Sequence, residues 1–299
     1  MTSISIREYV NALKREGKNI PQDESGTYWR RGEGGYLVRM PVFDLSAPDP
    51  ARINRLLRSD HAPMISYVIE PSEEHPANAK LYICRDQSYN MDKLAKKVRF
   101  SIKKSSVLRF EWLSKEIFLA NGLPAFRDSC KRNGLADGTS EVFQQKFRTW
   151  FNNPANGVIG AWKDDNLIAY YSTTAVDDWV EIGGESTNEG LVFNPNNGLV
   201  DRLLTEFLVE RKFRVVSYGL SSIQESSNAE GLHHFKVKVG FEAIPVRRVF
   251  VPHPYLRPLI NRFSLALGHR ALRIFPGSRG LRKGCGVLSR LVQTSPSPG

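Results

Sequence analysis

The sequence has few cysteines, and their spacing excludes two common uses of this residue. Cys84, Cys130 and Cys285 are the only three among 299 residues, and no two of them form a CxxC pair. The pattern therefore argues against a disulfide framework and against a zinc site, and it fits a reducing cytoplasm. We expect each cysteine to be a small, partly buried apolar residue.

Long apolar runs are also missing. No segment approaches the roughly 18–20 uninterrupted apolar residues that a membrane-spanning helix needs. Residues 1–20 have charges without an apolar run behind them, a pattern that predicts no signal peptide. We therefore expect a cytoplasmic protein, with any membrane association being peripheral and on the inner face.

Acidic residues are absent from the C-terminal part of the chain. The net charge is +11, and no Asp or Glu follows Glu242. Such asymmetry predicts a polyanionic neighbour, either nucleic acid or an anionic membrane surface. An apolar stripe at helical spacing predicts a basic amphipathic tail over 253–299, with 253–292 as the membrane contact. The alternative is a helix that docks on the protein with its arginines in water. The stripe and the cations after His253 are Leu256, Leu259, Ile260, Phe263 and Leu267, and Arg257, Arg262, Arg270, Arg273, Arg279, Arg282, Lys283 and Arg290.

The rest of the composition is that of a globular protein with room for two modest cores. Hydrophobic residues make up 41% and charged residues 24% of the chain. In the first part, periodicity predicts helices over 6–17, 48–59, 89–104, 116–133 and 141–151, and strands over 37–43, 64–69 and 79–84. The helix over 89–104 is cationic, and its charges favour either a solvated face or a phosphate-bearing partner.

The second part alternates strands and helices. Two apolar runs, 157–162 and 167–174, flank Lys163-Asp164-Asp165-Asn166, which is typical of a hairpin turn. Strands over 179–182, 215–220 and 241–251 and helices over 198–213 and 231–239 follow. The aromatic stripe Phe143, Phe147 and Trp150 is explained most simply as core packing.

The segment from Ser217 to Phe250, SYGLSSIQESSNAEGLHHFKVKVGFEAIPVRRVF, carries a family resemblance. Its order of strand, loop, helix, Gly240-Phe241 and strand resembles the end of a GNAT-type acyltransferase domain. The Phe235-Lys236 pair before Gly240 resembles the Fem-type peptidoglycan aminoacyltransferases and their FemAB-like relatives. The resemblance implies an α/β (α+β) tandem GNAT-like fold, with a mixed, mostly antiparallel central sheet flanked by helices. It also implies a degenerate N-terminal half over 1–120 and an acyltransferase domain over 121–252, followed by the tail.

The function that the resemblance implies is acyl-group transfer. We expect an N-acyltransferase that uses a thioester co-substrate, acyl-CoA or acyl-carrier protein, and a small-molecule or lipid-linked amine acceptor, with no covalently bound cofactor and no metal. An aminoacyl-tRNA-dependent Fem-type transferase remains an alternative. A non-catalytic GNAT-shaped module that binds lipid or nucleic acid is another. GNAT domains splay two central strands to admit the donor, so we expect the strands near 182 and 217 to diverge.

Four residues are the candidates for catalysis. GNAT enzymes commonly place a carboxylate at the end of a strand to take the amine proton, and Glu181 and Glu185 occupy that place around Gly183-Gly184. Many GNAT enzymes have a tyrosine four residues before the glycine of the Gly-Phe pair, where this chain has Lys236. Lys236 would offset negative charge on the oxyanion or leaving group, and Tyr218 lies on the strand beside the opening. The alternatives are a solvated glutamate and a solvated helix lysine.

Binding residues are expected in two loops. Asn194, Asn196, Asn197 and Gly198 precede a helix whose N-terminus would suit a donor phosphate. The glycine signature of coenzyme-A-binding members is not matched, because Pro195 and Val200 occupy its first and last positions. The alternative is an ordinary helix start. Ser221, Ser222 and Gln224 are expected to bind substrate, whereas His233-His234 is poor evidence for a metal because no third ligand is near in sequence.

Overall fold

The computed structural model describes residues 2–32, 35–136, 138–222 and 229–294, and it divides into two compact units. The first unit comprises residues 1–12, 81–221 and 227–244, and the second comprises 13–80, 222–226 and 245–299. Residues 81–120 therefore group with the first unit rather than with the N-terminal region. The correspondence between these units and the two GNAT-like halves predicted with a boundary at 120 stays a prediction.

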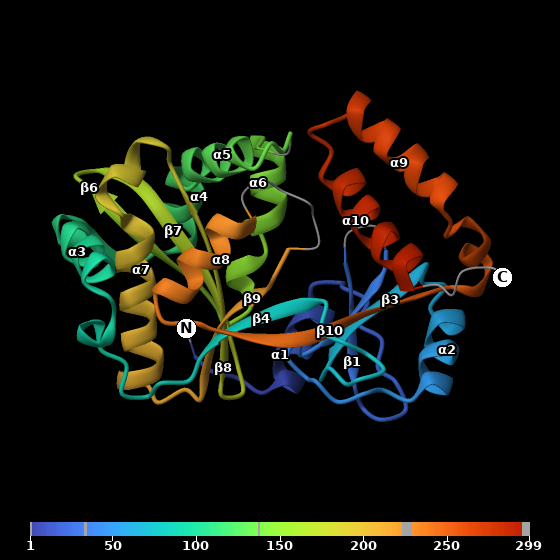
Figure 1. Ribbon diagram of the computed structural model, residues 1–299. Coiled ribbons are helices and arrows are strands. Elements are labelled where there is room, and N and C mark those ends of the chain that lie inside the picture. The colour runs from blue at the N-terminus through green and yellow to red at the C-terminus, as the bar shows by residue number, and fades with distance from the viewer. Residues whose placement is uncertain (1, 33–34, 137, 223–228, 295–299) are drawn as a thin grey trace. The chain divides into compact units, whose positions relative to one another are not determined.

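The first unit is built on a mixed, mostly antiparallel sheet (Figure 1). Its strands lie in the order β4 (Ala79–Cys84), β9 (Val215–Leu220), β8 (Trp179–Ser186), β7 (Asn166–Val176), β6 (Asn156–Lys163) and β5 (Arg109–Trp112). Every neighbouring pair in this series is antiparallel except β8 and β9, which are parallel. The predicted fold class is confirmed.

Helices cover both faces of this sheet. One cluster of buried side chains joins the sheet to α3 (Lys96–Lys104), α7 (Pro195–Leu204) and α8 (Ala229–Lys238). A second cluster, on the other face, joins it to α4 (Lys115–Asn121), α5 (Leu123–Arg132) and α6 (Ser140–Phe147). Because both faces are covered, the residues of β6 and β7 are buried almost continuously rather than at every second position.

The residue types at two connections of this unit explain the β6–β7 turn and the break between α4 and α5. Lys163 pairs with Asn166 across a two-residue turn, and Asp164 has the positive φ of 54° that such a turn requires. Aspartate tolerates this conformation better than most residues do. The helix predicted over 116–133 is divided at Gly122 into α4 and α5. A Cβ there would lie 2.6 Å from the Phe118 ring and 2.9 Å from the Phe143 ring.

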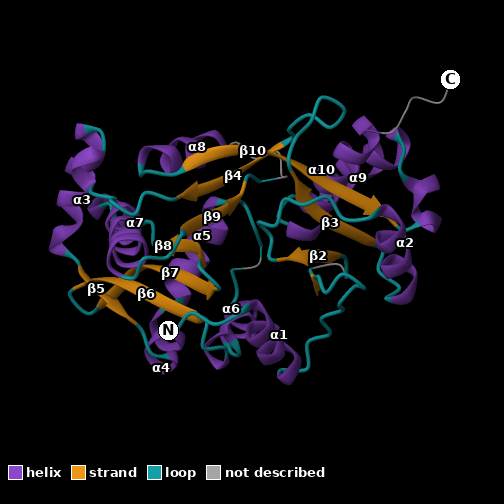
Figure 2. Ribbon diagram, turned by 90° about the horizontal axis from the view of Figure 1, so that it is seen from below, coloured by secondary structure: helices purple, strands orange, loops and turns teal. Residues whose placement is uncertain are grey.

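The second unit has its own strands and core (Figures 1 and 2). Its strands run in the order β1 (Tyr28–Arg31), β2 (Leu37–Met40), β3 (Met64–Ile69) and β10 (Glu242–Pro252), with only the β2–β3 pair parallel. Trp29, Leu37, Leu57 and Ile65 form its centre beneath α2 (Pro50–Ser59). The remaining described helices are α1 (Ile6–Arg15), which begins in the first unit, and α9 (Arg262–Ile274) and α10 (Arg279–Thr294).

Several expectations about buried residues are confirmed. All three cysteines are buried, and none of them forms a disulfide. Phe143 and Phe147 are fully buried in the second cluster of the first unit, and Trp150 packs at its edge. No helix among the described residues is long and apolar enough to cross a membrane.

Candidate active site

Strands β8 and β9 begin as a pair and then separate. Their pairing covers three positions and ends with Glu181 opposite Ser217. Beyond this point β8 stays paired with β7 as far as Ser186, and β9 stays paired with β4 as far as Leu220. Among the described residues no further β8–β9 pair follows, so the pairing ends where the sequence predicted it would. That the gap between the strands admits a donor stays a prediction. We call the unpaired stretch, residues 182–186 of β8 and 218–220 of β9, the wedge.

Lys236 is buried beside the wedge. Its side chain comes from α8, only 4% of the residue is exposed, and Nζ donates a hydrogen bond of 3.0 Å to the backbone oxygen of Tyr218. Nζ also lies 4.3 Å from the centre of the Tyr82 ring and 4.5 Å from that of the Tyr218 ring. Two aromatic faces attract a cation at such distances. The ammonium is thus held in place by a carbonyl and two rings.

Burial changes the acidity of this lysine. Loss of hydration lowers the pKa of Lys236 from 10.5 to about 8, and the nearby Glu181 carboxylate acts in the opposite direction. At neutral pH the side chain remains mostly protonated, although its proton is held far less tightly than that of a surface lysine. A solvated helix lysine, the alternative considered above, does not fit a residue this deeply buried; its neighbour Lys238 is exposed.

His233 contacts Tyr82, which is one of the two aromatic residues that face Lys236. The Tyr82 hydroxyl lies 2.9 Å from Nδ1 of His233. His234 instead is exposed and lies 3.5 Å from the Glu230 carboxylate. Within the described ranges no group of three or more His, Cys, Asp or Glu could hold a metal ion.

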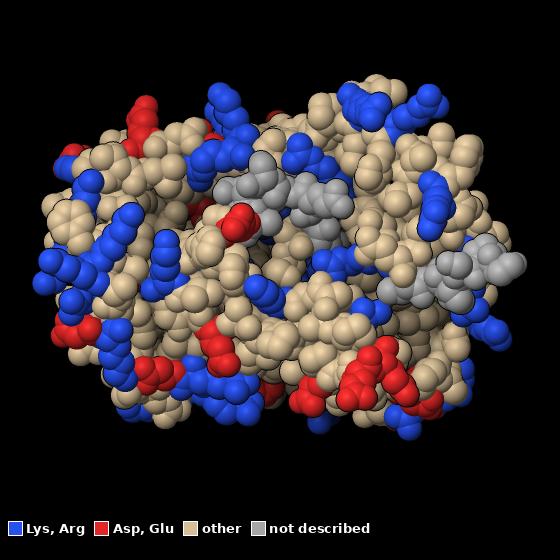
Figure 3. Space-filling view, viewed as in Figure 1, with Lys and Arg blue, Asp and Glu red and all other residues tan. Residues whose placement is uncertain are grey.

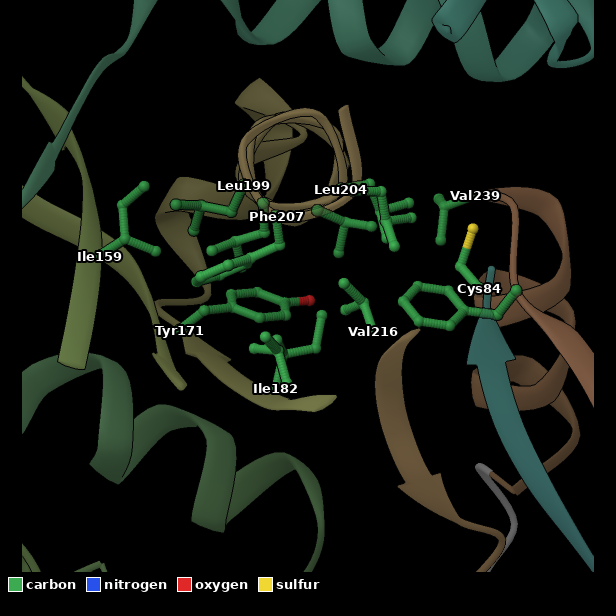
Figure 4. Close-up of a cluster of buried hydrophobic side chains, with 14 of the residues drawn as sticks. Cys84, Ile159, Tyr171, Ile182, Leu199, Leu204, Phe207, Val216 and Val239 are labelled. Atoms are coloured by element: carbon green, nitrogen blue, oxygen red, sulfur yellow. The ribbon is translucent and has the colours of Figure 1, made fainter. Parts of the chain in front are cut away.

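Tyr218 contributes its backbone and ring rather than an acidic phenol. Its hydroxyl lies 2.6 Å from that of Tyr171, whose ring sits among buried side chains beneath α7 (Figure 4). Burial raises the pKa of Tyr218 and that of Tyr171, and the charge of Glu185 acts in the same direction. Both phenols are therefore neutral at physiological pH.

The two predicted carboxylates lie on the sheet face opposite Tyr171 and Tyr218. Glu185 is the register partner of Tyr170, which belongs to the α4–α6 cluster, and Glu181 lies two pleats earlier on the same face. Gly183 lies between them, and a Cβ built there would meet nothing within 4 Å. Side chains can thus reach the wedge from both faces of the sheet, carboxylates from one and Lys236 from the other.

Residues 194–198, which were predicted to bind a donor phosphate, make contacts that shape the start of α7. Pro195 at the start of α7 has no N–H, and the N–H groups of Asn197 and Gly198 already donate to the oxygen of Asn194. A Cβ at Gly198 would lie 2.2 Å from Oγ of Ser105. Asn196 is half-buried, and its Nδ2 lies 3.4 Å from Oγ of Ser186. These contacts support the alternative of a helix start shaped by packing, and a phosphate site there stays a prediction.

The remaining predicted residues lie around the end of β9. Ser221 and Ser222 follow the strand directly. Gln224 lies outside the described residues. The role of these three in substrate binding stays a prediction.

A cavity of about 540 Å³ lies elsewhere in the first unit. It is lined by the β6–β7 turn, by parts of α4 and α5, and by the segment 187–193 that precedes α7. Its lining includes none of Glu181, Glu185, Tyr218 or Lys236. Volume alone therefore does not mark the candidate site, which rests on strand separation and the buried lysine.

Comparison with known proteins places the fold. No protein-family model matches the chain, and no curated protein matches it. The structure of FemX matches with a TM-score of 0.59 at 12% identity, over 86% of this chain and 94% of FemX. The C-terminal domain of a proposed lysylphosphatidylglycerol synthetase from Agrobacterium fabrum matches with a TM-score of 0.56 at 14% identity, over 91% and 94%. L-PGS from Bacillus licheniformis matches with a TM-score of 0.50 at 11% identity, over 87% and 95%.

These likenesses confirm the recognition from sequence at the level of fold. The chain shares the fold of FemX, of the proposed lysylphosphatidylglycerol synthetase domain and of L-PGS, which is the Fem-like, GNAT-like fold expected from the sequence. Sequence reasoning singled out Lys236, Tyr218, Glu181 and Glu185, whose catalytic roles stay predictions. It did not single out Tyr82 or Tyr171, which contact Lys236 and Tyr218. Tyr82 is separated from Lys236 by more than half of the chain, and no local pattern in the sequence indicates that contact.

Proposed function

We propose that this protein transfers an acyl group from an activated thioester or ester donor to an amine acceptor, with the acyl carbonyl placed in the wedge. The observation that carries the proposal is the buried ammonium of Lys236, held by Tyr218 O at the point where β8 and β9 part. Burying a cation is unfavourable unless it is compensated, so its placement needs a reason beyond solubility. Stabilising negative charge that develops during a reaction is such a reason.

The chemistry follows from the placement of the charges. The amine nitrogen attacks the carbonyl carbon, and the C=O electron pair moves onto oxygen, where the Lys236 ammonium stabilises it. Glu181 or Glu185 accepts the proton that the attacking nitrogen loses. The intermediate then collapses, the carbon–sulfur or carbon–oxygen bond breaks, and the leaving group takes the electron pair. The proton held by the carboxylate neutralises that group directly or through water.

The first candidate donor is a thioester of coenzyme A or of an acyl-carrier protein. The contacts at the start of α7 favour a second candidate, an aminoacyl-tRNA ester. Pro195 has no N–H, and the N–H groups of Asn197 and Gly198 already donate to the oxygen of Asn194. Few hydrogen-bond donors therefore remain there for the diphosphate of coenzyme A. The name of the lysylphosphatidylglycerol synthetase neighbour describes an aminoacyl group joined to a lipid, which makes this candidate, and a lipid-linked acceptor, worth testing.

The proposal places the protein in the cytoplasm, with a small-molecule or lipid-linked amine as acceptor. No covalently attached cofactor and no metal takes part in the steps above. A GNAT-shaped module that only binds lipid or nucleic acid would need no buried charge at the wedge. This is why we rank catalysis first.

Hydroxylamine in place of the natural acceptor makes the test independent of acceptor identity, because it is unprotonated and nucleophilic at neutral pH. The purified protein is incubated with hydroxylamine and, in turn, acetyl-CoA, a long-chain acyl-CoA, an acylated carrier protein and aminoacyl-tRNA, and hydroxamate is measured. We expect protein-dependent hydroxamate with one donor class. Donor consumption no faster than in protein-free solution for all four classes would contradict the proposal. Consumption of aminoacyl-tRNA alone would select the second candidate.

A further inference from the structure

Helix α9 has two faces with different surroundings, both within the second unit. One face packs on α10, where a Cβ at Gly268 would lie only 2.8 Å from Sγ of the buried Cys285. Leu265 and Leu272, on the same face as Gly268, are half-buried. The packing of α9 on the protein therefore already uses an apolar face.

The outer face of α9 is also apolar. Phe263 is 72% exposed and Ile274 is 71% exposed, and Leu267 lies between them at helical spacing. Phe275, directly after the helix, is exposed as well. Tyr255 and Leu259 continue the exposed apolar surface into the segment before α9. We call these six residues the apolar stripe; Phe263, Leu267 and Ile274 belong to α9, and the other three belong to the segments that flank it. Leu256 and Ile260, which were predicted for such a stripe, are half-buried instead. Several large apolar side chains exposed on one short part of a surface mark an interaction surface more often than a chance arrangement.

Cations border the apolar stripe without acidic partners. Arg257, Arg262, Arg270 and Arg273 are exposed, and none makes an ion pair among the described residues. No Asp or Glu follows Glu242 in the sequence. Lys and Arg side chains lie over α9 and α10 in the surface view (Figure 3).

Helix α10 holds α9 in place. The guanidinium of Arg290 donates a 2.7 Å hydrogen bond to the backbone oxygen of Asn78, a residue of the same unit. The Asn78 side chain in turn donates to the backbone oxygen of Arg248 in β10. The apolar stripe is thus presented on a packed pair of helices and not on a loose end.

We propose that the apolar stripe of α9 docks on an anionic lipid bilayer, with the helix lying in the plane of the membrane surface. Exposed aromatic and aliphatic side chains would enter the boundary between headgroups and acyl chains, and the flanking arginines would contact lipid phosphates. A second copy of the chain fits poorly, because two such surfaces carry the same charge. Nucleic acid would use the arginines but would leave Phe263, Leu267 and Ile274 exposed to water.

The test is co-sedimentation of the full chain with vesicles of mixed phosphatidylglycerol and phosphatidylcholine, and with vesicles of phosphatidylcholine alone. We expect binding to the anionic vesicles that weakens as salt is added. The double variant Phe263→Ser/Ile274→Ser should bind at least about tenfold more weakly, because it removes two side chains from the bilayer. Arg270→Gln/Arg273→Gln should lose roughly thirtyfold on anionic vesicles only.

Matched variants on α3 of the first unit provide the controls. Phe100→Ser removes a side chain that is 68% exposed, and Lys96→Gln/Lys97→Gln removes two exposed cations. Both should bind vesicles within about threefold of the unaltered protein. All altered side chains are exposed, so thermal unfolding should verify that every variant is folded. Equal vesicle binding by the Phe263/Ile274 variant and the unaltered protein would overturn the proposal, as would tighter binding to a single-stranded RNA than to anionic vesicles. The inference does not rest on the proposed acyl transfer, since vesicle binding is measured without a donor.

Discussion

Lys236 is nearly inaccessible to water, yet it carries a charge at neutral pH. Its Nζ contacts Tyr218 O and lies over the rings of Tyr82 and Tyr218, while burial lowers its pKa to about 8. Most buried lysines are unfavourable for stability, and a protein retains one where its chemistry is useful. We therefore expect that replacing Lys236 raises the stability of the protein and lowers its activity.

Replacement of Lys236 by methionine should stabilise the protein at neutral pH. Below pH 8 the lysine is protonated in both the folded and the unfolded chain, and the folded state carries the full penalty of roughly 3 kcal/mol for a pKa lowered from 10.5 to about 8. Loss of the donor to Tyr218 O offsets about 1–2 kcal/mol of this. We expect a net gain of about 1–2 kcal/mol in the free energy of unfolding at pH 7, measured by urea denaturation.

The same substitution gives a pH dependence of defined sign. As pH rises from about 8 to 10.5 the folded protein loses the Lys236 proton before the unfolded chain does, so the penalty disappears and the unaltered protein gains stability relative to Lys236→Met. Over this pH range the free energy of unfolding of the unaltered protein should rise relative to that of Lys236→Met. A difference that stays constant from pH 7 to pH 10 would show that Lys236 is not desolvated in solution.

Catalysis should follow the protonated form of Lys236. If its ammonium stabilises the oxyanion, kcat/KM with hydroxylamine should fall as pH rises through about 8, because hydroxylamine itself stays unprotonated there. A profile of kcat/KM against pH checks this. A rate that continues to rise up to pH 10 would mean that the neutral amine is the active form, and Lys236 would then act as a base.

At the scale of elements, two adjacent glycines of β8 should behave differently. A Cβ at Gly184 would lie 2.1 Å from the buried Tyr171 ring, whereas one at Gly183 meets nothing within 4 Å. Gly184→Ala should destabilise the protein by about 1–3 kcal/mol through overpacking. Gly183→Ala should leave stability within about 0.5 kcal/mol and serves as the matched control. Equal thermal unfolding of the two variants would mean that Tyr171 does not pack across β8 as described.

Elements with strong local signals were predictable from the sequence. The strands over 64–69, 79–84 and 215–220 have the predicted bounds, and the order from the hairpin to β10 is as predicted. Two strands were missed, β1 and β5. Each has only four residues, and only one of these eight residues, Trp29, is fully buried, so neither shows an alternating pattern.

Two predicted helices were wrong in extent, for physical reasons. The cationic helix predicted over 89–104 is two pieces, because the chain turns to extended geometry at Leu94 and Ala95 before α3 begins. The helix predicted from 198 starts earlier, at Pro195, and changes to π-helical geometry over Thr205–Glu210. Proline is well suited to a first helical position, a signal that was present in the sequence.

At the scale of the whole molecule, the candidate site lay partly beyond sequence reasoning. The spacing of Lys236 from Gly240 singled out the lysine through a family resemblance. Its burial depends on Tyr82 of β4 and Tyr218 of β9, which meet α8 only in the folded chain. Likewise, the sequence shows that the tail holds cations and apolar residues. It does not show which face of α9 packs on α10 and which face stays exposed.

The candidate site lies within the first unit, and the apolar stripe lies within the second. Phe263→Ser/Ile274→Ser should therefore leave kcat/KM for a water-soluble donor and hydroxylamine within about twofold of the unaltered value, since surface substitutions away from a site have small effects. Steady-state rates measured without vesicles check this. A large loss of turnover in solution would indicate that the apolar stripe takes part in donor binding.

The role of Lys236 is tested by comparing hydroxamate formation by Lys236→Met and by Lys238→Met under the same conditions. The two lysines lie on one helix, but only Lys236 is buried beside the wedge. Lys236→Met should lower kcat by about 10²–10³, the effect of removing one oxyanion donor. Lys238→Met should retain the rate of the unaltered protein. Equal rates for the two variants would show that the buried ammonium has no part in the chemistry.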